Sequence, residues 1–203
     1  VQNVLIGGLS GDALTNADYN VAVGNNTLST DTLGSKSTAI GYEALATQNF
    51  TTATDSNNTA VGFQAGASVT TGANNTIVGA QAGDALTDAD YNVALGTSAL
   101  SADTLGSRST ALGTSALAAQ NFTTATNSDN TAVGAFTGDA ITTGIDNTLI
   151  GAFAGSALTD ADHNVAIGRA ALASDTLGSK SVAIGREALV TQNFTTATDA
   201  YNV

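Results

Sequence analysis

The stretch Asn164-Val165-Ala166-Ile167-Gly168 decides the fold, because a phrase of this kind occurs eleven times in the chain. Each copy has a polar residue, a β-branched residue, a small or aliphatic residue, an aliphatic residue and then glycine. The glycines are Gly7, Gly24, Gly41, Gly62, Gly79, Gly96, Gly113, Gly134, Gly151, Gly168 and Gly185. They follow one another at 17 residues, except for two steps of 21 after Gly41 and Gly113, which gives a larger unit of 72 residues. A fixed period of this size predicts a solenoid of stacked coils.

Each copy has the pattern of a short β-strand. The residue before glycine is always aliphatic, the residue two positions earlier is always β-branched, and residues two apart share one face of a strand. The column between them is Ala in eight copies. Because neither column is polar, we expect both faces to be buried, with Val23, Leu28 and Leu33 inside the coil and the Ala face against a close neighbour. No segment has a sustained helical period with caps, so the class is all-β.

Two further columns predict how the coil turns. Asn stands four residues before glycine in eight copies, including Asn20, Asn92 and Asn164, and Ser stands there in three. Such residues bond to nearby backbone and, when stacked, can form a ladder from coil to coil. We expect the motif glycines to supply the positive φ that closes each strand.

Composition limits the classes of partner. Five Lys+Arg against 17 Asp+Glu give a net charge of −12, which argues against nucleic acid and anionic membrane surfaces as partners. The chain has no run of 18 apolar residues, so this segment is not expected to insert into a membrane. No proline and no linker interrupts the repeat. Residues 1–203 are therefore predicted to form one solenoid domain, an interior part of a longer fibrous protein.

The narrow coil favours association. A coil that encloses a few aliphatic side chains gains about 1.5–3 kcal/mol for each of them, against about 1–2 kcal/mol for each residue that it orders. The apolar second face therefore predicts packing along the length of the rod. A homotrimer is a natural arrangement, because it buries three such faces around one axis.

The phrase resembles repeats of known fibrous proteins. Asn164–Gly168 and Ser181–Gly185 resemble the head repeats of YadA-type trimeric autotransporter adhesins, and Asn58–Gly62, followed by Ala65, is similar to repeats of phage and marine-bacterial tail-fibre-like proteins. The resemblance implies a left-handed parallel β-roll of about eleven 17- or 21-residue coils in each chain. It also implies a homotrimer, an extracellular location on a cell surface or virion, and a receptor or glycan as the target.

Acidic residues at alternate positions suggest one candidate metal site. Asp88 and Asp90, and again Asp160 and Asp162, have the spacing of calcium-loop oxygens. Calcium takes six to eight oxygen ligands, so such a site would need backbone carbonyls or a neighbouring chain. The alternative is a solvated turn. No other cofactor is indicated, and with no Cys and one His, His163, neither a Ser-His-Asp triad nor a transition-metal site is expected.

The 21-residue coils contain the distinctive aromatic residues Phe50, Phe122 and Phe194. Each Phe either fills the wider interior of its coil or is presented on a protruding loop for receptor contact. Asp31 and Lys36 flank a turn that recurs in the other two units. We expect them to be surface residues of that turn, and any ion pair between them to contribute little to stability.

These observations predict a structural and adhesive fibre module that is not an enzyme. A self-assembling extracellular filament would use the same rod. A glycan hydrolase would need a carboxylate pair beside a cleft, whereas the aspartates here recur with the repeat. An ice-binding surface would need a regular Thr face, but Thr is the β-branched residue in only six of eleven copies, and the longer coils are expected to interrupt the spacing.

Overall fold

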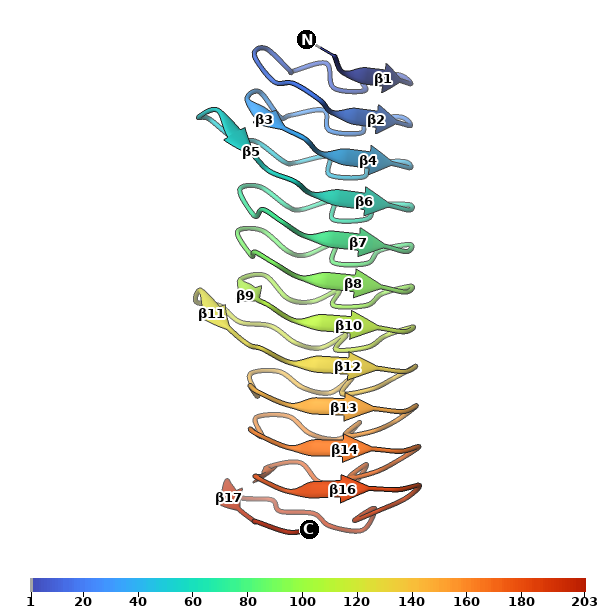
Figure 1. Ribbon diagram of the computed structural model, residues 1–203, viewed down its shortest axis with the longest axis vertical. Coiled ribbons are helices and arrows are strands. Elements are labelled where there is room, and N and C mark those ends of the chain that lie inside the picture. The colour runs from blue at the N-terminus through green and yellow to red at the C-terminus, as the bar shows by residue number, and fades with distance from the viewer. Residues whose placement is uncertain (1) are drawn as a thin grey trace.

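The computed structural model describes residues 2–203 and shows a parallel β-solenoid without helices, as the repeat predicts. The chain ends lie at opposite ends of the rod (Figure 1). One sheet of eleven strands runs its whole length. Its strands are β1 (Val4–Ile6), β2 (Val21–Val23), β4 (Thr38–Ile40), β6 (Thr59–Val61), β7 (Thr76–Val78), β8 (Val93–Leu95), β10 (Thr110–Leu112), β12 (Thr131–Val133), β13 (Thr148–Ile150), β14 (Val165–Ile167) and β16 (Val182–Ile184).

The strands of this sheet are parallel and in register from copy to copy. Val21 pairs with Thr38 between β2 and β4, which belong to coils 17 residues apart. Thr38 in turn pairs with Thr59 between β4 and β6, across a coil of 21 residues. The four extra residues therefore leave the ladder undisturbed, and the interruption of spacing that we expected does not occur.

The extra residues form a second, local ladder at a corner of the rod. A two-residue strand in each long coil pairs with a two-residue strand in the coil before it. The pairs are β3 (Gly34–Ser35) with β5 (Thr54–Asp55), β9 (Gly106–Ser107) with β11 (Thr126–Asn127), and β15 (Gly178–Ser179) with β17 (Thr198–Asp199). In Figure 1, β5, β11 and β17 stand out from the side of the rod away from the long sheet.

The orientation of the strands corrects one expectation. The middle residue of each strand faces the interior, so that Ala22 is fully buried, whereas Val21 and Val23 on the opposite face are only partly buried. Leu28 lies in the core as expected, but Val23 and Leu33 do not belong to it. An alanine occupies the sheet side of the interior in eight of the eleven copies, with Leu5, Ile77 and Leu149 at the same position in the others, and the residues that flank it in the strand point outward.

Two kinds of coil fill this interior in complementary ways. Where the fourth residue after the motif glycine is Leu, as in Leu28 and Leu45, that side chain is fully buried. Where it is Gly, as in Gly83, the space belongs to Leu86, whose side chain a Cβ at Gly83 would touch at 2.9 Å. Each coil thus places one aliphatic side chain larger than alanine in the core from one of these two positions, and Ile77 and Leu149 at strand centres add a second one beside Gly83 and Gly155.

The motif glycines have the predicted backbone conformation. Gly113, for example, has φ +142°, and a Cβ there would fall on the carbonyl oxygen of Gly134 in the next coil. Both the positive φ and the close approach of the two backbones require glycine. Gly24, Gly41, Gly62, Gly79, Gly96, Gly134, Gly151, Gly168 and Gly185 also have positive φ.

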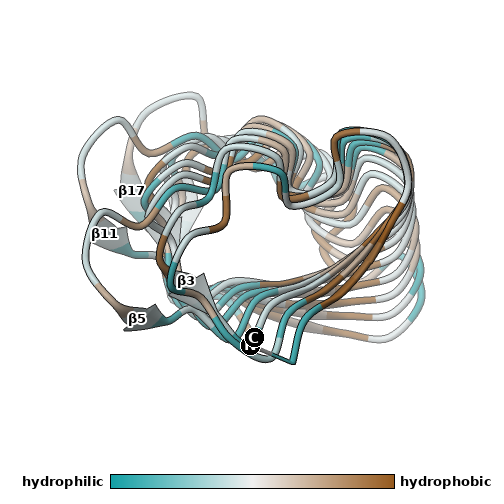
Figure 2. Ribbon diagram, turned by 90° about the horizontal axis from the view of Figure 1, so that it is seen from above, coloured by the Kyte–Doolittle hydropathy of each residue, from teal (hydrophilic) through white to brown (hydrophobic). Residues whose placement is uncertain are grey.

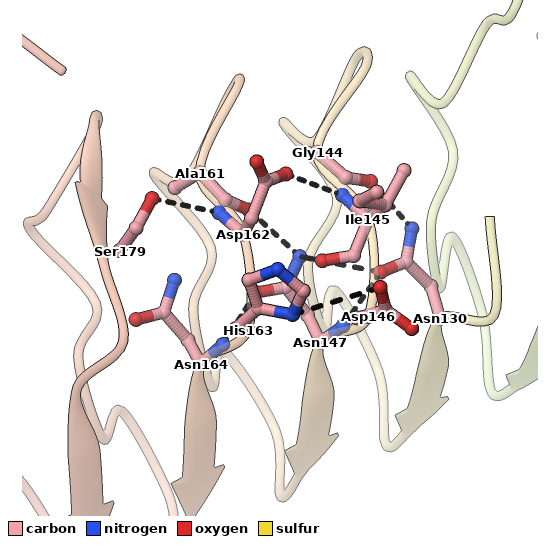
Figure 3. A network of polar contacts seen from close by, with 10 residues as sticks. All are labelled: Asn130, Gly144, Ile145, Asp146, Asn147, Ala161, Asp162, His163, Asn164 and Ser179. Atoms are coloured by element: carbon pink, nitrogen blue, oxygen red, sulfur yellow. Dashed lines mark hydrogen bonds and ion pairs between the residues drawn. The ribbon is translucent and has the colours of Figure 1, made fainter. Parts of the chain in front are cut away.

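The asparagines form the predicted ladder inside the rod (Figure 3). Asn147 accepts a 3.0 Å hydrogen bond on Oδ1 from the backbone NH of Asn164, one coil further on, and its Nδ2 donates to the carbonyl of Ala161 at 2.7 Å. Asn20, Asn92 and Asn164 donate in the same way to Gly34, Gly106 and Gly178. Since these side chains are buried, each ladder bond also satisfies an amide that would otherwise be unpaired.

Within residues 2–203 no helix has the length and apolar character needed to cross a bilayer.

Candidate functional site

The first candidate is the outward face of the eleven-stranded sheet, which we call the outer face. Its first column contains Val4, Val21, Thr38, Thr59, Thr76, Val93, Thr110, Thr131, Thr148, Val165 and Val182. Its second column contains Ile6, Val23, Ile40, Val61, Val78, Leu95, Leu112, Val133, Ile150, Ile167 and Ile184. No residue in either column is charged, and Leu95 in the middle of the rod is 43 % exposed.

The outer face is large for an uncovered apolar surface. With neighbouring strands about 4.8 Å apart and the two columns about 7 Å apart, it measures roughly 50 Å by 7–10 Å, or about 350–500 Å². The largest apolar patches on monomeric proteins are about 300–600 Å² and are often functional. A single chain of this solenoid therefore leaves a continuous stripe of aliphatic residues and threonines at its surface.

Aromatic pairs border this stripe. Tyr42 and Phe63 follow β4 and β6 by two residues, are exposed, and stack with ring centroids 5.4 Å apart and an interplanar angle of 12°. Glu43 accepts a 2.8 Å hydrogen bond from Gln64 in the adjoining column, and this bond holds the pKa of Glu43 below its ordinary value. Hydrogen bonding to Glu43 in turn raises the pKa of the Tyr42 hydroxyl.

A second stacked pair lies in the other half of the rod. Phe136 and Phe153 have centroids 5.4 Å apart at 8° and are also exposed. The two aromatic pairs occupy different positions relative to their motif glycines, so they do not follow the 72-residue unit. They enlarge the apolar surface locally.

The second candidate is the set of three long-coil loops. Viewed along the rod, β5, β11 and β17 protrude on the same side (Figure 2). The structure places Phe50 and Phe122 at the base of these loops, each 6 % exposed, and Phe194 is partly buried. The phenylalanines therefore fill the wider interior, and of the two roles left open by the sequence, direct presentation on the loop is wrong.

Each loop is held by a buried polar network that the sequence did not reveal. Asp31 is fully buried rather than a surface residue, and its Oδ1 accepts hydrogen bonds from the backbone NH groups of Gly34 and Phe50 at 3.0 and 3.1 Å. Its Oδ2 accepts a 2.6 Å bond from Nε2 of Gln48, whose Oε1 accepts from Asn58 at 2.9 Å. Asp103 with Gln120 and Asp175 with Gln192 repeat the arrangement.

Serine replaces the ladder asparagine where this network enters the core. Ser37 Oγ accepts a 3.0 Å bond from Gln48 Nε2 and lies 2.6 Å from Ser56 Oγ. Ser109 makes the corresponding contacts, at 2.8 Å to Gln120 and 2.6 Å to Ser128. The three serines that break the asparagine column are thus fitted to the glutamine of the long coil.

Asp31 and Lys36, which we expected to be surface residues with a weak ion pair at most, do not pair in the structure. Lys36 instead forms an ion pair with Asp55 on the neighbouring strand β5, with 2.6 Å between Nζ and Oδ2. Lys180 pairs in the same way with Asp199, which holds the pKa of Lys180 above and that of Asp199 below their ordinary values. These exposed pairs connect the first and third protruding loops to the coil before each of them.

The tips of the loops are residues 51–53, 123–125 and 195–197, each with the sequence Thr-Thr-Ala. All nine residues are exposed. Where the chain leaves the first tip, the Thr54 hydroxyl Oγ1 donates a 3.0 Å hydrogen bond to the carbonyl of Thr52 within the tip. The tips lie in the loops that protrude from the rod on this side (Figure 2).

The candidate calcium ligands bind neighbouring coils. Asp90 and Asp162 accept hydrogen bonds on Oδ1 from the backbone NH groups of Ala73 and Ile145, at 2.7 and 2.8 Å. Asp88 and Asp160 accept from threonine hydroxyls of the preceding coil. Residues 2–203 contain no group of three or more acidic or histidine side chains placed to hold a metal ion. These carboxylates serve as cross-coil hydrogen-bond acceptors.

His163 lies at the surface corner, half exposed, with its Nδ1 3.6 Å from a carboxylate oxygen of Asp146 (Figure 3). Tyr19 and Tyr91 occupy the matching position in the other units and are exposed too. All three have positive φ, so this column forms a left-handed turn that precedes the asparagine ladder.

No protein-family model matches the chain, and neither does any curated protein or solved structure with which it was compared.

Proposed function

We propose that the chain is a non-catalytic structural and adhesive module, a rod that assembles with copies of itself and presents its loops for attachment. The observation that carries the proposal is the outer face, an uncharged apolar stripe that runs the length of the rod. The loops support the attachment role, because each is a rigid protrusion built on a dedicated buried network. A cell surface or virion is the location that the resemblance of the repeat favours.

We further propose that three copies pack their outer faces around a common axis parallel to the rod. A stable interface buries about 800 Å² on each partner; the stripe alone gives about 350–500 Å², and the bordering aromatic pairs add to it. The stripe is only two side chains wide, which suits the narrow space around a three-fold axis. In this arrangement the aliphatic column takes the contact role that we had expected for the alanine column, which lies inside the coil.

The experiment is a mass measurement on the intact chain and on Leu95→Glu. The wild-type chain is expected to sediment at about 60 kDa, three copies of a 19.9 kDa chain. Leu95→Glu is expected to be a folded monomer, because the exposed position tolerates a charge in one chain whereas the packed face would bury it unpaired. Ala125→Glu adds the same charge at an exposed loop tip, on the side of the rod away from the long sheet, and is expected to leave the assembly intact.

Two results would count against this assembly. A wild-type chain that is monomeric across the micromolar range would refute self-association through any face. An assembly that persists unchanged in Leu95→Glu would place the interface elsewhere. A stable dimer, or an open filament, would keep the outer face as the interface but refute three-fold closure.

Ice binding is a second candidate, favoured by one observation. Because the long coils do not disturb the ladder, the outer face is an in-register array of Thr or Val beside an aliphatic column, repeated at the strand spacing. The two functions compete for the same surface, since the trimer buries it. Thermal hysteresis measured on the monomeric Leu95→Glu chain and on wild type separates them: ice binding requires hysteresis in wild type that Leu95→Glu reduces.

A further inference from the structure

The three loop tips share a sequence that the fold does not demand. In residues 51–53, 123–125 and 195–197 no residue has a positive φ, so the backbone does not restrict the choice of side chain. The hydroxyls of Thr51 and Thr52, like those of the matching threonines, make no hydrogen bond within residues 2–203. Packing does not select these residues either, since all of them are exposed.

Several exposed positions elsewhere have diverged among the units. The residue after the motif glycine of the long coil is Tyr42 in the first unit, Thr114 in the second and Arg186 in the third. Next to the tips, Asp55 of the first unit is matched by Asn127 in the second. Identical tips among diverged surface positions indicate a constraint from outside the chain, and contact with a ligand is a constraint of that kind.

The tips are held in fixed positions. At the base of the central loop, Phe122 is buried and its backbone NH donates to the buried carboxylate of Asp103 at 3.1 Å. On the return side, the NH of Ser128 donates to the carbonyl of Ser107 at 3.0 Å. A loop fixed at both ends loses little conformational entropy on binding, which favours even weak contacts.

The spacing of the tips points to a ligand that repeats. Successive tips are 72 residues and four strands of the long sheet apart, or about 19 Å along the rod. They lie on the same side of the molecule (Figure 2). Three identical sites in a row can all be used by a polymer of identical units, whereas a folded protein, whose surface does not repeat, would engage one of them.

The chemistry of the tip favours a neutral, hydroxylated polymer. Each tip offers two hydroxyls, which both donate and accept hydrogen bonds, together with methyl groups and exposed backbone. The nearest lysine of the first loop, Lys36, is already paired with Asp55, and the chain has a net charge of −12, which repels anionic polymers. We propose that the three tips together bind one neutral polysaccharide chain, a proposal that rests on the attachment function given above.

Binding of this kind depends on avidity. A single tip has no pocket and makes a few hydrogen bonds, so its own affinity is low. Once one tip is bound, the others meet the same polymer at high effective concentration, which can raise the overall affinity by about 10²–10⁴. Loss of tips should therefore reduce binding in steps, and oligosaccharides too short to span two tips should compete poorly.

The experiment measures co-sedimentation of the chain with insoluble neutral polysaccharides, namely cellulose, chitin, curdlan, mannan and starch granules, and with calcium alginate gel as the anionic comparison. Variants replace both threonines of a tip by Ala in one, two or all three tips. Thr97→Ala with Thr114→Ala removes two exposed threonines outside the tips and is the matched control. Melting temperatures of all variants should agree, because none of these side chains is packed.

The proposal expects binding to at least one neutral polysaccharide, with affinity falling about tenfold or more for each altered tip and unchanged in the control. It is overturned if no neutral polysaccharide binds, if binding is confined to alginate, or if the three-tip variant binds like wild type. Sedimentation of the same samples tests assembly separately: a monomer that binds polysaccharide refutes the trimer alone, and a trimer that binds none refutes the role of the tips alone.

Discussion

Replacement of Asp103 by Asn tests the buried polar network that carries the central loop. Asn can keep an acceptor toward the NH groups of Gly106 and Phe122, which lie 3.0 and 3.1 Å from Asp103 Oδ1. In the wild-type chain, Oδ2 of Asp103 accepts a 2.6 Å hydrogen bond from Nε2 of Gln120. The asparagine places its NH₂ group at this point, so two donors face each other. Rotation of the Gln120 amide does not help, because its Oε1 accepts from Asn130 at 2.9 Å.

The expected cost of Asp103→Asn follows from these contacts. A hydrogen bond to a charged group is worth about 1.5–3 kcal/mol, and a buried donor left unpaired costs about 1–3 kcal/mol. We expect a loss of about 3 kcal/mol in local stability. Asp103→Asn with Gln120→Glu restores a donor facing an acceptor, leaves the net charge unchanged, and should recover more than half of that loss.

The assay is native-state hydrogen exchange at the amides of Thr126 and Ser128, which pair β11 with β9. Local exchange is the suitable measurement because a repeat array need not unfold in one step. A loss of 3 kcal/mol corresponds to exchange about 150-fold faster. The control Asp160→Asn alters an exposed carboxylate and should stay within about 1 kcal/mol of wild type.

The reasoning fails if Asp103→Asn exchanges within threefold of wild type, because the carboxylate would then not be required by its three donors. It also fails if the double variant is no more stable than the single one, since the loss would then come from the missing carboxylate at position 103 itself rather than from the mismatch of donors.

Three further substitutions test other parts of the structure. Gly113→Ala should lower the free energy of unfolding, measured by urea titration, by about 3 kcal/mol or more, because the residue has φ +142° and its new methyl group meets the next coil's backbone. The control Thr114→Ala should stay within about 0.5 kcal/mol of wild type in the same titration. Phe122→Ala should lower the stability of its loop by about 3 kcal/mol or more, as limited proteolysis would detect; an unchanged cleavage rate would mean that the ring does not hold the loop. Burial raises the pKa of Asp84, so its charged form destabilises the fold, and this penalty appears as pH rises through the raised pKa. Asp84→Ser introduces the residue that the third unit has at the matching position, Ser156, and should raise the melting temperature at pH 7. The gain should vanish below pH 3.8, the ordinary pKa of aspartate. Equal melting temperatures of wild type and Asp84→Ser at pH 7 would contradict a destabilising charge at Asp84.

The parts of the fold that the sequence predicted are those that depend on the repeat period. The strand positions, the positive φ of the glycines and the asparagine ladder each require one residue type at a fixed place, so every copy reports the same constraint. Which strand face is inside was not predicted correctly, because both columns are apolar or small. Volume accounts for the alanines: where the fourth residue after the motif glycine is Leu, as in Leu28, the strand places Ala22 in the interior, whereas Ile77 fits because Gly66 and Gly83 leave space for it.

The buried network was missed for a different reason. Asp31 and Gln48 lie in successive coils at the position that Leu86 occupies in other coils, seven residues after the motif glycine. A polar pair at a core position in two stacked coils is a signal of mutual hydrogen bonding, and the column is visible once the copies are aligned. The exposed tips gave a signal of another kind, their identity in the three units, which acquires meaning only when the structure shows that nothing in the fold accounts for it.

The undisturbed ladder across the 21-residue coils separates two properties that are usually linked in a folded chain. The pitch of the rod is set by the strand and its glycine, whereas the extra residues are absorbed at one corner, outside the main sheet. That corner can therefore change in length and content without altering the distance between coils. The spacing between loops along the rod therefore does not depend on what each loop contains. A loop inserted at Thr52 of the first unit would lie about 19 Å along the rod from the loop of the second unit.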